Sequence, residues 1–232
     1  MNFIENIQNN VPFVFAKFGD GEYNAVIRLR GENCDGTPYT EMLGQQIHDA
    51  FLYLTQFPNV YIGKWADFNS VAEYWIKLAQ HPIHWADYNL LICRSKAEFL
   101  HRGVQYFRAI RNAPQQKIYV CNYSMVEMSR ELLKIDDFAV VDPVHWFEKN
   151  YDGVLNDVCV KVTNPENLMI LTSAGMGAKP LIADLWKKYP KSIIIDVGSA
   201  LDAVCSLRKS RDYHNIFTME DIQEIRAALF HS

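Results

Sequence analysis

Two carboxylates stand close together near the start of the chain, in the sequence Lys17-Phe18-Gly19-Asp20-Gly21-Glu22. Asp20 and Glu22 are one residue apart and flanked by glycines, so both can reach one hard divalent cation. Such a cation keeps several waters and takes its remaining ligands from substrate phosphates. The same residues also fit a helix start, with Asp20 as the N-cap and Glu22 complementing the helix dipole. The motif therefore predicts either a metal and phosphate site or a capped helix.

A loop of small residues offers a second place for chemistry. It spans residues 173–178, contains Gly175 and Gly177, and is followed by Lys179 on the first turn of an expected helix. Glycines let the backbone approach an anion closely, and the free N–H groups of a helix start supply partial positive charge. The loop therefore predicts a phosphate site to which Lys179 adds a full charge; the alternative is a tight turn without a ligand.

Two further acids follow the next apolar run. Asp196 ends a β-branched segment about 20 residues beyond the glycines, where nucleotide-binding folds place a ribose acceptor. Transfer of a group to a hydroxyl needs a general base, often a carboxylate, that takes the hydroxyl proton. Asp196 and Asp202 could each supply it, or could instead be a ribose contact and a helix cap. Arg208 and Arg211 are candidates, with Lys179, for stabilising the negative charge of a phosphate leaving group.

The elements that must position these residues alternate between strand and helix. Apolar and β-branched runs predict strands at 12–18, 60–62, 88–93, 117–121, 138–141, 168–171 and 193–197. Amphipathic segments between them predict helices, so the fold class is α/β and Rossmann-like, with a mostly parallel sheet flanked by helices. No linker interrupts the pattern, which predicts one domain over residues 1–232. Ligands of such sheets collect at the carboxyl ends of the strands.

Composition narrows the class of protein. The 232 residues carry a net charge of −4, so no general basic field attracts nucleic acid. Five scattered cysteines without a C-x-x-C pair argue against a disulfide framework and a zinc site. The N-terminal residues lack the features of a signal peptide, and no stretch has the roughly 20 apolar residues of a membrane span. We therefore expect a cytoplasmic protein without a transmembrane segment.

Three motifs in this order, FGDGE, SAGMGAKPL and IDVGSALD, resemble the GT-D-type glycosyltransferases, a family first catalogued as a domain of unknown function. The resemblance implies a Rossmann-like enzyme that moves a sugar from a nucleotide donor, usually a UDP-sugar, to a glycan or glycoconjugate acceptor. It also implies a D-x-E motif, matched by Asp20 and Glu22, that serves a divalent metal (Mn²⁺ or Mg²⁺) and the diphosphate. The residues that follow Asp202 depart from many members, so the resemblance concerns the donor more than the acceptor.

Together these observations predict a set of site residues. The acids expected to take part in catalysis are Asp20, Glu22, Asp196 and Asp202, of which the first two also hold the metal. The residues expected to bind the donor are Lys17, Phe18, Gly19, Ser173, Ala174, Gly175, Gly177, Lys179 and Arg211.

Two other functions fit parts of the sequence. Gly175-x-Gly177 with Asp196 partly imitates the fingerprint of dinucleotide or S-adenosylmethionine enzymes, but such folds place the glycine loop after the first strand. A non-catalytic nucleotide-binding module is the second alternative. Nucleotide binding with and without metal, followed by donor turnover, separates the three.

Overall fold

The computed structural model describes residues 2–64, 70–142, 144–207 and 210–230. Within these residues, seven strands form one sheet in the order β3-β2-β1-β7-β6-β4-β5, and every neighbouring pair is parallel. The strands are β1 (Phe13–Lys17), β2 (Val60–Lys64), β3 (Trp85–Asp87), β4 (Gln116–Cys121), β5 (Asp137–Val140), β6 (Leu168–Thr172) and β7 (Ile193–Asp196). The predicted α/β class with a parallel sheet is confirmed.

The central strands are apolar on both faces because helices cover the sheet on both sides. Along β1, Phe13 and Phe15 belong to one hydrophobic cluster, while Val14 and Ala16 belong to the other. Successive side chains of a strand point to opposite faces, so a strand buried on both sides is a continuous apolar run. This explains why no alternation of polar residues marks β1, β6 or β7 in the sequence.

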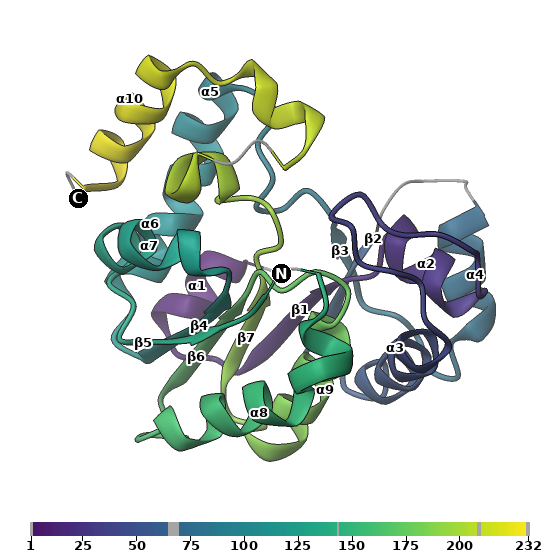
Figure 1. Cartoon of the computed structure of the whole chain (residues 1–232). Helices are drawn as coiled ribbons and strands as arrows, with labels where there is room; N and C mark the ends of the chain where they lie inside the picture. The colour runs from purple at the N-terminus through teal and green to yellow at the C-terminus, as the bar shows by residue number, and fades with distance from the viewer. Residues whose placement is uncertain (1, 65–69, 143, 208–209, 231–232) are drawn as a thin grey trace.

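Helices from different parts of the chain form the two layers (Figure 1). One cluster is completed by α1 (Phe3–Gln8), α6 (Val104–Asn112), α7 (Val126–Leu133) and α10 (Met219–Phe230). The other is completed by α2 (Asp20–Val26), α3 (Glu41–Leu54), α4 (Ser70–Leu78), α8 (Trp146–Lys161) and α9 (Ala178–Lys188). Shorter turns are α5 (Lys96–Glu98), η1 (Phe99–Gly103), η2 (Tyr123–Met125), η3 (Asp202–Ser206) and η4 (Asp212–Ile216). None of the helices in the described part of the chain combines the length and hydrophobicity needed to cross a bilayer.

One predicted strand is wrong. Residues 88–93 form turns, and the edge strand β3 lies just before them at Trp85–Asp87. Leu91, Ile92 and Cys93 are nevertheless buried in a hydrophobic cluster. A short apolar run predicts that the segment is buried, but a buried segment need not be a strand.

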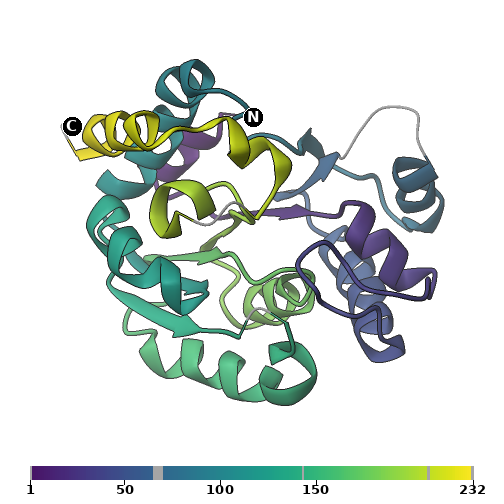
Figure 2. The same ribbon diagram turned by 45° about the horizontal axis from the view of Figure 1, so that its top comes forward.

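The strand order creates a crevice at the carboxyl edge of the sheet. After β4 the chain continues to its neighbour β5, whereas after β6 it crosses to β7 on the other side. The connections that leave β4 and β6 therefore diverge, and ligands of open α/β sheets bind at such a switch point. Residues 200–207 and 210–217 and the loop after α2 approach this edge (Figure 2).

Candidate active site

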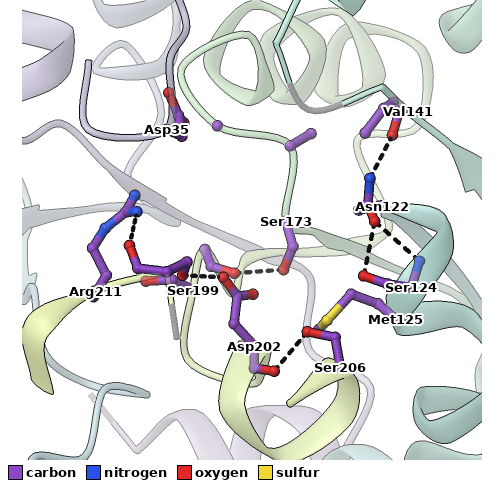
Figure 3. Close-up of a pocket in the computed structure, with 14 residues that line it drawn as sticks. Asp35, Asn122, Ser124, Met125, Val141, Ser173, Ser199, Asp202, Ser206 and Arg211 are labelled. Atoms are coloured by element: carbon purple, nitrogen blue, oxygen red, sulfur yellow. Dashed lines mark hydrogen bonds between the residues drawn. The ribbon is translucent and has the colours of Figure 1, made fainter. Parts of the chain in front are cut away.

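Two adjoining pockets occupy the carboxyl edge of the sheet. We call the first the serine pocket, because it is lined by Ser124, Ser173, Ser199, Ser206 and Ser210 together with Asn122 and Asp202 (Figure 3). The second, of about 290 Å³, is the acidic pocket, lined by Asp20, Glu22 and Asp196 among others. Five residues line both pockets: Asp35, Gly175, Gly198, Ser199 and Arg211. The two pockets therefore form one cleft, with these residues at their junction.

Four buried charges lie at the base of the acidic pocket. Lys179 Nζ is 2.9 Å from Glu22 Oε1 and 2.9 Å from Asp196 Oδ2. Lys17 Nζ is 3.9 Å from Asp196 Oδ1 and donates a hydrogen bond to the Val197 carbonyl at 2.9 Å. These side chains come from the end of β1, the first turn of α2, the first turn of α9 and the end of β7. The cluster thus joins the acidic motif to the glycine loop.

The pairing decides the charge state of each member. Burial alone would raise the pKa of Asp196, but Lys179 and Lys17 outweigh it and lower that pKa below its usual 3.8. Burial opposes the charge on Lys179 as well, yet Asp196 and Glu22 raise its pKa above 10.5. The pKa of Lys17 is lowered, chiefly by burial, because its nearest carboxylate oxygen is farther away. The Lys179–Asp196 pair therefore stabilises the folded protein between about pH 4 and pH 10.5. This contribution is lost as the pH falls below about 4 or rises above about 10.5.

Asp20 and Glu22 have different environments. Glu22 is buried, and its second oxygen, Oε2, accepts a hydrogen bond from the Gly19 N–H at 2.9 Å. Both Glu22 oxygens are thus engaged, by Gly19 and by Lys179. Asp20 is exposed at the rim of the acidic pocket, and none of the described residues forms a hydrogen bond or ion pair with its carboxylate. A helix does start here, as the alternative predicted, but its N-cap is Gly19 and not Asp20. Glu22 caps the Gly19 N–H, and the Asp20 carboxylate stays open.

These environments test the fit of a divalent cation. No group of three His, Cys, Asp or Glu side chains in the described ranges is arranged to hold a metal ion. Of the two acids of the motif, Asp20 offers an open carboxylate, while Glu22 would have to exchange Lys179 for the ion. The residues therefore fit a cation that takes most of its ligands from a bound phosphate and from water.

The glycine loop contains one residue that faces the cleft and one that does not. Gly175 is exposed, has φ of +62°, and lines both pockets. Gly177 is buried beneath the loop, where a Cβ atom would lie 2.7 Å from Cζ2 of Trp146. Gly177 thus allows close packing against α8. It lines neither pocket, which corrects its prediction as a donor-binding residue. The side chain of Phe18 is likewise in the core, at 5.2 Å between ring centroids from both Phe51 and Trp75.

The serine pocket is organised by hydrogen bonds among its own residues. Ser173 Oγ lies 2.6 Å from the Tyr119 hydroxyl and donates to the Gly198 carbonyl at 2.6 Å. Asp202 accepts a hydrogen bond from Ser210 through Oδ2. Asp202 lines this pocket, as predicted from the sequence. Asp196 lies at the base of the acidic pocket and is almost wholly buried (1% exposed).

Arg211 is the one cation among the five residues that line both pockets. Its Nη1 donates to the Ser210 carbonyl at 2.7 Å, and none of the described residues accepts from its other guanidinium nitrogens. Lys179, in contrast, is fully paired. Arg208 lies outside the described residues. Arg211 therefore presents a guanidinium fork at the junction of the pockets, a geometry that suits phosphate oxygens.

The residue that sequence reasoning missed is Asp35. It lies in the turn-forming loop 31–38, outside every motif, and lines both pockets. The composition of that loop predicted a turn and nothing about what the turn touches. Only the path of the chain from α2 to α3 brings Asp35 to Gly175.

The packing of Gly177 leads to a test. A Gly177→Val substitution should destabilise the protein by about 1–3 kcal/mol, because its side chain would overlap the Trp146 ring. Gly175→Ala should also cost some stability, because Gly175 has φ of +62°. It should in addition weaken the binding of UDP, since its Cβ would stand inside the cleft, 3.0 Å from Asp35 Oδ2. Thermal unfolding and UDP calorimetry on both variants separate the two effects. An unchanged melting temperature with weaker UDP binding in Gly177→Val would return Gly177 to the ligand site.

Comparison with known proteins concerns the fold. No protein-family model and no curated protein match the sequence. A structure of the domain of unknown function 1792 (DUF1792) superposes with a TM-score of 0.60 and 18% identity, over 85% of this chain and 76% of that chain. A second structure superposes with a TM-score of 0.60 and 16% identity, again over 85% of this chain and 76% of that chain. It is described as showing that this highly conserved domain has a distinct glycosyltransferase fold.

A third structure, a new glycosyltransferase (DUF1792) from Streptococcus sanguinis, superposes with a TM-score of 0.61 and 14% identity, over 85% of this chain and 78% of that chain. The resemblance predicted from the three motifs is thus confirmed at the level of the fold. The chain has the DUF1792 fold, which is described as a distinct glycosyltransferase fold.

Proposed function

We propose that this protein is a glycosyltransferase that moves a sugar from a nucleotide-sugar donor, most simply a UDP-sugar, to a glycan or glycoconjugate acceptor. The observation that carries the proposal is the cleft of two pockets that meet at Gly175 and Arg211, on a chain with a glycosyltransferase fold. Two substrates that exchange one group need adjoining sites with the reacting atoms between them. A nucleotide-binding module would need only one of these pockets.

The donor diphosphate belongs at the junction in this proposal. Cleavage of a sugar–phosphate bond leaves negative charge on the diphosphate, and groups already in place lower the barrier by stabilising it. The guanidinium of Arg211 and the backbone at Gly175 are the two groups suited to this task. The glycine loop and α2 are held in a fixed relation by the buried cluster of Lys17, Glu22, Lys179 and Asp196. The groups that contact the donor are therefore in place before the donor binds.

A divalent cation, Mn²⁺ or Mg²⁺, completes the proposal. Asp20 would hold it together with the donor phosphates, and Glu22 could join only by giving up Lys179. When bound, the cation would neutralise charge on the departing diphosphate. Asp20, for its part, keeps an open carboxylate beside the glycine loop without being needed for the fold.

The test compares Asp20→Asn with Glu22→Gln. Asn at position 20 keeps the size of the side chain, so the melting temperature should stay within about 2 °C while Mn²⁺-dependent UDP binding weakens and turnover falls by orders of magnitude. Glu22→Gln removes a buried charge that pairs with Lys179, so it should lower the melting temperature as well.

Calorimetry with and without Mn²⁺ measures the UDP affinity of both variants and of the unaltered protein. If Asp20→Asn kept full activity that EDTA does not affect, the metal would be removed from the proposal. A metal-independent preference for NAD or S-adenosylmethionine over UDP would point to another class of enzyme.

A further inference from the structure

One carboxylate at the pocket junction has no role in the donor site. Asp35 lines both pockets, and its Oδ2 lies 3.0 Å from where a Cβ on Gly175 would stand. In Figure 3, Asp35 and Asp202 lie on opposite sides of the serine pocket. Asp35 therefore borders the space in which the contents of the two pockets would meet.

The loop that carries Asp35 is held by its own hydrogen bonds. Asp35 Oδ1 accepts from the Thr37 N–H at 3.0 Å, and the Asn33 N–H donates to the Thr37 carbonyl at 2.8 Å. Gly36 takes the left-handed conformation that closes the turn (φ +82°). The half-buried side chain thus uses one oxygen to fix the loop, and no described residue donates a hydrogen bond to the other. This leaves Oδ2 able to accept a hydrogen bond, and then a proton, from a substrate hydroxyl.

The other acids of the cleft are less suited to accepting a proton from a substrate. Asp196 is buried, and its two lysine partners lower its pKa. Glu22 is engaged by Lys179 and by the Gly19 N–H. Asp202 lines the serine pocket only, and Asp20 and Asp212 line the acidic pocket only. Of these acids, Asp35 alone combines an open oxygen with a place at the junction.

We propose that Asp35 is the general base that activates the acceptor hydroxyl, and that the transfer inverts the anomeric configuration; this rests on the proposed glycosyltransferase function. Asp35 Oδ2 takes the proton of the acceptor hydroxyl as its oxygen attacks the anomeric carbon. The bond between that carbon and the diphosphate oxygen breaks, and its electron pair leaves with the diphosphate. The proton on Asp35 then returns to water. A carboxylate base of this kind contributes about 10²–10⁴-fold to the rate.

The test uses Asp35→Asn, because an amide oxygen can still accept from the Thr37 N–H and preserve the loop. Transfer should fall by about 10²–10⁴-fold, while the melting temperature, UDP affinity and Mn²⁺ affinity remain those of the unaltered protein. Glu32→Gln is the matched control, since Glu32 is an exposed acid of the same loop that lines neither pocket; it should retain full activity.

Azide supplies a readout that a structural role would not affect. Azide is a nucleophile without a proton, so it should restore donor consumption by Asp35→Asn and give a glycosyl azide of inverted configuration. Retention of configuration by the unaltered enzyme, full transfer by Asp35→Asn, or a tenfold loss of Mn²⁺ affinity would each overturn the role of Asp35 and leave glycosyl transfer standing. Failure of the unaltered protein to consume any nucleotide sugar would remove both proposals.

Discussion

Lys179→Met should lower the free energy of unfolding by about 3–5 kcal/mol, a large effect for one substitution. The Lys179 ammonium is 2.9 Å from carboxylate oxygens of both Glu22 and Asp196, and all three side chains are buried. Removing the cation leaves Glu22 without an ion-pair partner among the described residues, and leaves Asp196 with Lys17 at 3.9 Å. In a chain of this length the loss corresponds to a melting temperature roughly 6–20 °C lower.

Lys187→Met is the matched control on the same helix. Lys187 pairs with Asp184 at 2.9 Å, but its side chain is about half exposed, so its loss should change stability by about 0.5 kcal/mol or less. Differential scanning calorimetry on both variants gives the comparison. Equal melting temperatures in the two variants would show that the buried cluster does not hold α9 against α2 and β7.

Arg211→Met should reduce donor turnover by about 10²–10³-fold and weaken UDP binding at least tenfold, because it removes charge stabilisation from the departing diphosphate. Arg211 makes one hydrogen bond to the Ser210 carbonyl, so the fold should survive its replacement. Arg211→Lys keeps the charge but loses the guanidinium fork, so its activity should lie between that of the unaltered protein and that of Arg211→Met.

Steady-state kinetics and UDP calorimetry measure the effect of Arg211. Lys191→Met is the control, since Lys191 pairs with Glu166 just before the amino end of β7, at the edge opposite the cleft. Normal UDP affinity and turnover in Arg211→Met would move the diphosphate away from the junction of the pockets.

The fold class and most strands follow from local patterns in the sequence. The runs that form β1, β6 and β7 are apolar enough to predict buried parallel strands, and their carboxyl ends locate the motifs at one edge. The run at 88–93 is equally apolar but packs as a turn. Which strands pair is set by contacts between distant segments, so no local pattern gives the order that places β7 between β1 and β6.

The site could be located from the sequence, but the partners of its residues could not. Asp20, Gly175, Asp202 and Arg211 line the cleft as the motifs predict. Lys179 was expected to meet phosphate, yet in the fold it neutralises two buried carboxylates, because packing α9 against α2 and β7 brings all three together. Gly177 and Trp146 are 31 residues apart, so the packing reason for that glycine depends on tertiary structure.

Donor consumption by the unaltered protein tests the central claim most directly. The purified chain would be incubated with a panel of UDP- and other nucleotide-sugars, with Mn²⁺ or with EDTA, and release of the nucleoside diphosphate followed over time. Glycosyl transfer predicts metal-dependent release from at least one donor, strongly reduced in Asp20→Asn and Arg211→Met. Tight UDP binding without release from any donor, even with mixed glycan acceptors present, would contradict the claim and leave a protein that binds nucleotides without turning them over.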